Sequence, residues 1–218
     1  MAKVTRAKKK TPPPGRPKAF DPHRVLDAAL RVFWKKGYEG TSVADLTAAM
    51  RINKPSLYAT FGDKAALFRK VVDDYMEQQS TVWNDAFRLP TAKASVARIL
   101  NSVANALTNG KNPRGCLLVQ AALSCGDEAD CIKKELAARR ADGDSLIRGR
   151  LLRAQADGEL SRGVDAAALS RFFSTVLRGM SVEASAGATR AQLQSVIELA
   201  LKAWPDEEKP KKVLPAEV

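Results

Sequence analysis

The segment Thr41–Phe61, with the sequence TSVADLTAAMRINKPSLYATF, constrains the fold of this chain more than any other. Ser42 is a favourable N-cap residue and Asp45 follows it three positions later, so this pattern predicts a helix from near Val43 through Met50. A three-residue turn and a second short helix, with an asparagine cap and a proline in its first turn, complete the segment. The segment therefore reads as two short helices joined by a tight turn.

The distribution of apolar residues in this segment predicts how the two helices pack. One face of the second helix is small, polar and basic, which suits a helix that enters a DNA major groove. We therefore predict a helix-turn-helix motif, with a purely structural hairpin as the alternative, since any helical hairpin shows similar apolar spacing. The residues expected to be buried between the helices are Leu46, Ala49, Ile52, Leu57 and Phe61.

A wider window, from Val25 to Phe68, resembles the N-terminal domain of the TetR family of bacterial transcriptional regulators. The family usually has glycine in the turn where this chain has Arg51. If the turn requires a positive φ there, a residue other than glycine costs roughly 1 kcal/mol. The resemblance is carried by Ala29, Phe33, Gly37, Thr41, Val43, Leu46, Ala49, Ile52, Lys54, Ser56, Leu57, Tyr58, Phe61, Lys64 and Leu67.

The resemblance and the predicted helices together indicate a DNA-binding surface. We expect Lys54, Ser56 and Thr60 to reach base edges from the second helix, and flanking side chains to touch the DNA backbone. The partner is expected to be a double-stranded operator of pseudo-palindromic sequence. The full set of predicted DNA-binding residues is Thr41, Ser42, Lys54, Pro55, Ser56, Tyr58, Thr60 and Lys64.

The formal net charge of +12 points to an anionic partner, and its distribution favours DNA. Seven basic residues and no acidic residue occur in residues 1–20, directly before the helix-turn-helix. Residues 1–19 are expected to form a disordered basic arm, because their Lys and Pro content provides little apolar surface to bury. A simple solubilising tail is the alternative. Residues 205–218 are expected to be a polar tail.

The remainder of the chain is predicted to be helical, so the expected fold class is all-α. Alanine and leucine are abundant, and no segment shows the alternation of a half-buried strand. We expect a DNA-binding domain at residues 20–63 and a helical effector-binding and dimerisation domain at residues 64–204. The helices predicted outside the helix-turn-helix span about 21–36, 63–87, 91–108, 128–156, 165–185 and 189–204, with a further apolar helix after residue 116.

The last two predicted helices are apolar over more of their circumference than one core requires. In the TetR family the corresponding helices pair across a two-fold axis into a four-helix bundle, so the resemblance implies a homodimer. The predicted interface residues are Leu169, Phe172, Phe173, Val176, Leu193, Ile197, Leu201 and Trp204. The candidate walls of a ligand cavity, for which ordinary core packing is the alternative, are Trp83, Phe87, Cys116, Gln120, Phe172 and Val176.

Several classes of protein are disfavoured by the sequence. There is no HExxH, GxSxG or P-loop motif, so an enzyme is not expected. The single histidine, His23, and three cysteines without CxxC spacing predict neither a metal site nor a disulfide framework, and no cofactor is expected. The longest apolar run is too short to span a bilayer, so we expect a cytoplasmic protein.

The predicted function is a dimeric transcriptional regulator, most simply a repressor released from its operator by a small-molecule effector. An architectural DNA-binding protein without sequence preference is the remaining alternative. It would account for the basic arm but not for the large C-terminal core.

Overall fold

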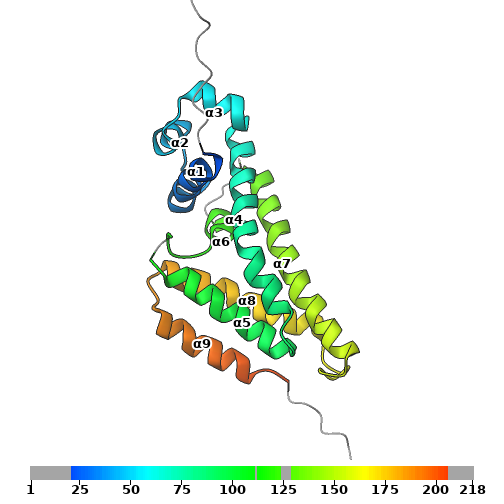
Figure 1. Cartoon of the computed structure of the whole chain (residues 1–218). Coiled ribbons are helices and arrows are strands. Elements are labelled where there is room, and N and C mark those ends of the chain that lie inside the picture. Colours follow the sequence, from blue (N-terminus) through cyan, green and yellow to red (C-terminus); the bar gives the residue numbers. More distant parts are fainter. Residues whose placement is uncertain (1–20, 111, 124–128, 206–218) are drawn as a thin grey trace, which may run out of the picture.

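The computed structural model describes residues 21–110, 112–123 and 129–205, which form helices and no strand (Figure 1). The all-α prediction is therefore confirmed. The predicted basic arm and, apart from Pro205, the predicted tail lie outside these residues. The helices are α1 Pro22–Lys36, α2 Val43–Met50, α3 Lys54–Phe61, α4 Lys64–Phe87, α5 Ala92–Thr108, α6 Leu117–Leu123, α7 Asp130–Ala156, α8 Ala166–Ser185 and α9 Arg190–Lys202.

Side-chain caps fix the starts of the helices that carry the DNA-binding motif. Asp21 accepts from the backbone N–H of His23 at the start of α1, and Asn53 accepts from that of Ser56 at the start of α3. These caps satisfy N–H groups that have no partner within the helix. The predicted starts of α1, α2 and α3 are confirmed, whereas α9 ends at Lys202, two residues before the predicted end.

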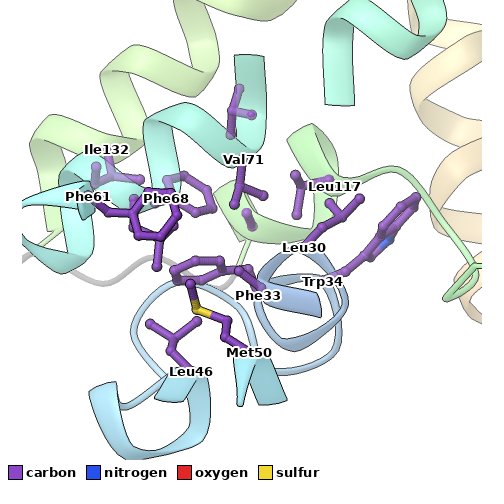
Figure 2. Packing of buried hydrophobic residues seen from close by; sticks show 14 of the residues in the cluster. Leu30, Phe33, Trp34, Leu46, Met50, Phe61, Phe68, Val71, Leu117 and Ile132 are labelled. Carbon is purple, nitrogen blue, oxygen red and sulfur yellow. The ribbon is translucent and has the colours of Figure 1, made fainter. Parts of the chain in front are cut away.

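The upper hydrophobic core joins the helix-turn-helix to the first half of α4. Phe33 of α1 is fully buried and meets Phe68 of α4 edge to face, with 4.9 Å between ring centroids (Figure 2). Leu46, Leu57 and other buried side chains of α2 and α3 pack into the same cluster. Leu117 of α6 and residues at the start of α7 close it from the opposite side. The core of the DNA-binding motif is therefore continuous with helices that come much later in the chain.

The lower core is formed by α5, α7, α8 and α9, around the fully buried ring of Phe173. The end of α4 also reaches it, since Trp83 and Phe87 pack against this cluster. A buried guanidinium strengthens the corner after α4: Arg150 of α7 donates to the carboxylate of Glu159 (3.0 Å) and to the carbonyl of Pro90 (3.2 Å). The 24-residue α4 thus contributes side chains to both cores.

Two side chains predicted to be buried are exposed. Ala49 was placed between the helices of the motif, but Met50 fills that position and Ala49 is exposed. The crossing of α2 with α1 sets the buried face, and α2 is too short for its own periodicity to define it. The apolar spacing of the helix predicted at about 128–156 places both Leu146 and Ile147 inward. In α7, however, Leu146 is 55% exposed and only Ile147 is buried.

None of the helices formed by the described residues is both long enough and apolar enough to cross a membrane.

A capping box and an ion pair fix α2 beside α1. The side chain of Ser42 accepts from the backbone N–H of Asp45, and Asp45 accepts from the backbone N–H of Ser42. Lys36 at the end of α1 donates to the same carboxylate at 2.6 Å. The hydrogen bonds from Lys36 and then from Ser42 hold the pKa of Asp45 at about 2, below its usual 3.8.

This depressed pKa predicts a pH-dependent contribution to stability. The contribution is fully present above the unfolded-state pKa, near 3.8, and is lost as pH falls through the folded-state value of about 2. Asp45→Asn should therefore lower the urea midpoint at about pH 7, and its difference from the native chain should shrink between about pH 4 and about pH 2. A Lys36→Gln variant serves as the partner in a double-mutant cycle. A difference that stays constant with pH would contradict the assignment.

The packing of Phe33 predicts a large loss of stability on truncation. Phe33→Ala removes a fully buried ring and leaves a cavity in the upper core, which should cost about 3–5 kcal/mol in urea unfolding. Leu146→Ala is a matched control on an exposed position and should change stability by less than about 0.5 kcal/mol. Equal effects of the two substitutions would show that the upper core is not packed as described.

Candidate nucleic-acid interface

Helix α3 lies at one end of the elongated molecule (Figure 1), and one of its faces is exposed. Lys54, Pro55, Tyr58 and Thr60 are exposed, whereas Leu57 and Phe61 on the opposite face are buried. Ser56 is half-buried. The predicted division between a buried and a free face of α3 is therefore present, and the free face combines a cation, hydroxyl groups and small side chains.

Lys54 and Tyr58 lie one turn apart on this face and contact each other. The ammonium nitrogen of Lys54 is 5.8 Å from the centroid of the Tyr58 ring, and Tyr58 is 43% exposed. A cation held over an aromatic face is restricted in its orientation. Both groups are thereby placed on the exposed side of a helix whose other side is fixed in the core.

Lys64, the first residue of α4, is held in a comparable way. Its ammonium nitrogen lies 4.5 Å from the centroid of the Tyr38 ring. Burial lowers the pKa of Lys64, and the charge of Glu39 opposes this shift. The contact joins two positions far apart in the chain, and no residue near Tyr38 in the sequence indicates that Tyr38 belongs to this surface.

The predicted DNA contact by the side chain of Thr41 is wrong. Thr41 is 1% exposed, and its hydroxyl donates to the carbonyl of Gly37 at 2.6 Å, where it satisfies the end of α1. Ser42 is exposed, but its hydroxyl is occupied in the capping box of α2. Of the residues predicted before α2, only Ser42 remains on the surface.

Arg51 adds a cation that was not among the predicted DNA-binding residues. It occupies the turn between α2 and α3 with φ 56° and ψ 42°, the left-handed conformation that the sequence analysis considered for this position. Its side chain is exposed. Lys54 follows it by three residues, so two cations flank the start of α3.

The six residues predicted to line a ligand cavity are distributed over several elements. Trp83 and Phe87 contact each other at the end of α4, with ring centroids 5.9 Å apart. Cys116 and Val176 are partly buried against the lower core, and Gln120 is half-buried on α6. Phe172 is 39% exposed on α8.

Two pockets in the described part of the chain involve other residues. An open pocket of about 390 Å³ lies between α1 and α2 and is lined by Ala28, Arg31, Val32, Lys35, Lys36, Asp45 and Ala49. A pocket of about 10 Å³ lies between α4 and α7. None of the six predicted cavity residues lines either pocket.

The predicted dimer interface needs correction because half of it is internal. Leu169, Phe173, Leu193 and Ile197 are buried in the core of a single chain and are not available to a partner. Val176, Leu201 and Trp204 are partly buried against the same core. The exposed large apolar side chains of α8 and α9 are Phe172, Val182, Val196 and Leu199.

No group of three or more His, Cys, Asp or Glu residues within the described ranges is arranged to hold a metal ion.

Comparisons with known proteins agree with the geometry of this surface. The family model described as "Bacterial regulatory proteins, tetR family" matches residues 25–71, and "Tetracyclin repressor-like, C-terminal domain" matches residues 92–200. The repressor ComR of Escherichia coli K12 is 31% identical over 194 residues, which cover 88% of this chain and 92% of ComR. The repressor BdcR of the same organism is 32% identical over 190 residues, 85% of this chain and 90% of BdcR.

Solved structures extend the similarity to the whole fold. A cysteine mutant of the TetR family regulator CifR, complexed with 26-bp operator DNA, has a TM-score of 0.84 and 42% identity, covering 87% of this chain and 100% of that chain. A TetR regulator from Rhodococcus sp. RHA1, described as putative, has a TM-score of 0.58 and 39% identity over 83% of this chain and 97% of that one. The family models and relatives together cover the helix-turn-helix and the helical body, and the chain belongs to the TetR family of bacterial transcriptional regulators.

Proposed function

We propose that this protein is a transcriptional repressor that binds a pseudo-palindromic operator as a homodimer and is released by a small-molecule effector. The observation that carries the proposal is the exposed face of α3, which presents Lys54, Tyr58 and Thr60 on a helix fixed by the upper core. Family membership makes the chain a DNA-binding regulator and not an enzyme. The relatives named as repressors support repression over activation.

On this surface, Lys54, Ser56 and Thr60 are the proposed base readers. Tyr58 on α3 and Lys64 at the start of α4 are the proposed phosphate contacts. A protein acting on chromosomal DNA in a bacterium works in the cytoplasm, and we infer that location for this chain.

The proposed dimer forms through the exposed apolar side chains of α8 and α9. Phe172 and Val182 on α8 bracket Gly179, which is exposed and lacks a side chain, so another helix can approach closely there. Val196 and Leu199 lie one turn apart on α9, and Leu199 is 65% exposed. Two helices from each copy would bury these side chains in a four-helix bundle. The two helix-turn-helix motifs would then be related by a two-fold axis, which requires an operator with two-fold symmetry.

The proposed effector response is supported by contacts that connect the DNA-binding helices α1–α3 to α8. The ring of Tyr75 on α4 meets Trp34 of α1 edge to face, with centroids 5.2 Å apart. On its other side the Tyr75 hydroxyl donates to the sulfur of Cys116 at 3.6 Å, and the backbone N–H of Cys116 donates to the hydroxyl of Ser181 on α8 at 2.7 Å. Burial raises the pKa of Tyr75 well above its usual value.

The experiment that tests the proposed function is selection of DNA fragments by the purified full-length protein, followed by sequencing. Recovery of a pseudo-palindromic sequence with half-sites about one helical turn apart is the expected result. Enrichment of no sequence over input would instead favour an architectural DNA-binding protein. The genes next to the recovered operator would then suggest effectors for release assays.

Substitutions on α3 should change sequence preference. Lys54→Ala or Ser56→Ala should alter the preferred base at particular operator positions by on the order of 1–3 kcal/mol where a base contact is lost. Binding to a panel of single-base operator variants measures this change. Uniform weakening across the whole panel would reassign these residues to phosphate contact.

Deletion of residues 1–18 should act differently, because the segment supplies positive charge without fixed geometry. It should weaken binding to operator and random DNA alike and flatten the plot of log K against log salt, by roughly one unit per lost phosphate contact. Fluorescence anisotropy over a salt series measures both quantities. A changed base preference after this deletion would contradict the assignment.

The proposed dimer interface predicts the effect of placing negative charges on the exposed faces of α8 and α9. Leu199→Glu combined with Val182→Glu should convert a dimer into a folded monomer in analytical ultracentrifugation, because two carboxylates per chain would be buried without partners. Leu146→Glu, a comparably exposed leucine on α7, is the control and should leave the dimer intact. A double variant that sediments as a dimer would place the interface elsewhere.

A further inference from the structure

Arg51 is held in a conformation that its side chain disfavours. Among the described residues it is the only one other than glycine with a positive φ, at 56°. A Cβ atom in the left-handed region crowds the backbone, so glycine or asparagine would occupy this position with less strain. The turn keeps the conformation because both α2 and α3 are fixed: the N–H of Ile52 donates to the carbonyl of Thr47, and Leu57 is buried.

The side chain of Arg51 has no role within the fold that would explain its presence. It is exposed, and no hydrogen bond or ion pair of its guanidinium is seen with any described residue. The acid on α2, Asp45, is already bonded to Lys36 and Ser42. A strained residue that stabilises nothing in the folded chain points to a function outside it.

The position of Arg51 suggests what that function is. Arg51 lies in the turn between α2 and α3, the proposed reading helix. Figure 1 shows both helices at the same end of the molecule. Lys54 is exposed three residues later, and Asn53 between them is an uncharged cap. Lys54 is a proposed base reader, so the neighbouring cation of Arg51, which has no acidic partner among the described residues, is placed to meet the negative charge of the DNA backbone beside the groove.

We propose that Arg51 is a phosphate anchor of the DNA-binding surface, and that the chain retains a strained residue in the turn for this contact. The inference rests on the proposed operator binding. The guanidinium of Arg51 bonds a backbone phosphate next to the groove that α3 enters, so Arg51 fixes the position of α3 on DNA without reading sequence.

Three variants separate the charge of Arg51 from its backbone conformation. Arg51→Asn and Arg51→Gly remove the charge and relieve the strain, whereas Arg51→Lys keeps both. Thermal unfolding and anisotropy titrations with the selected operator and with random DNA are measured on each full-length protein over a salt series. Asn and Gly variants should melt higher, by about 2–4 °C for a chain of this size.

The same two variants should bind operator and random DNA on the order of 100-fold more weakly, about tenfold for each chain of the proposed dimer, with a salt slope lower by about two units. Arg51→Lys should keep the native melting temperature and the native slope. If Arg51→Asn keeps the native DNA affinity and salt slope, Arg51 is not a phosphate anchor. If Arg51→Gly melts at the native temperature or below it, the backbone at position 51 is not strained.

Failure of the proposed role of Arg51 can be distinguished from failure of the proposed operator binding. If the native protein selects an operator and Arg51→Asn binds it equally well, only the role of Arg51 is lost. If the native protein enriches no DNA sequence and shows no salt-dependent binding, both the operator proposal and the anchor are overturned.

Discussion

The contact between Phe33 and Phe68 is the one on which the placement of the DNA-binding surface depends. It joins α1, the scaffold of the helix-turn-helix, to α4, and Tyr38 packs on Phe68 from the same side with centroids 5.1 Å apart. The other end of α4 is fixed by Trp83 and Phe87 in the lower core. Because one helix belongs to both cores, the orientation of α3 relative to the body is set by aromatic packing along α4.

Ion pairs reinforce the same helix from the side of α7. Arg69 donates to both carboxylate oxygens of Glu135, at 2.8 and 2.7 Å, and Arg139 pairs with Asp73. The hydrogen bonds from Arg69 lower the pKa of Glu135. These groups are largely exposed, so each pair contributes little to stability, but a bidentate pair has a defined geometry. The pairs therefore constrain the register of α4 against α7 more than they stabilise the fold.

The local parts of this structure were predictable from the sequence, and the parts set by packing were not. Caps act within three residues, so Ser42, Asn53 and Asp63 indicated where helices start. Burial depends on partners that are distant in the chain. Thr41 is predicted on the DNA surface, but packing buries its side chain, and its hydroxyl bonds the carbonyl of Gly37, four residues earlier, at the end of α1. The free face of α3 was predictable, since Leu57 and Phe61 define its opposite side.

The C-terminal helices show the same limit. Phe172 and Phe173 are adjacent and equally apolar, yet one is exposed and the other fully buried. Successive residues on a helix point about 100° apart, so a wide apolar arc contains both the core of one chain and a surface for a second. Only the position of the neighbouring helices divides the arc. The sequence shows which positions of these helices are apolar, but it does not show which of them face the core of the same chain and which are exposed.

The length of α4 has a geometric consequence for signalling. Its 24 residues span about 36 Å at about 1.5 Å per residue. A rigid tilt of about 5° at one end displaces the other by about 3 Å, close to the roughly 3.4 Å between successive base pairs. A rearrangement near Trp83 too small to disturb the lower core would thus shift the reading helix by almost one base-pair step. Through this length, a small change in packing at one end of α4 would move the DNA-binding surface at the other end by a distance comparable to the spacing of base pairs.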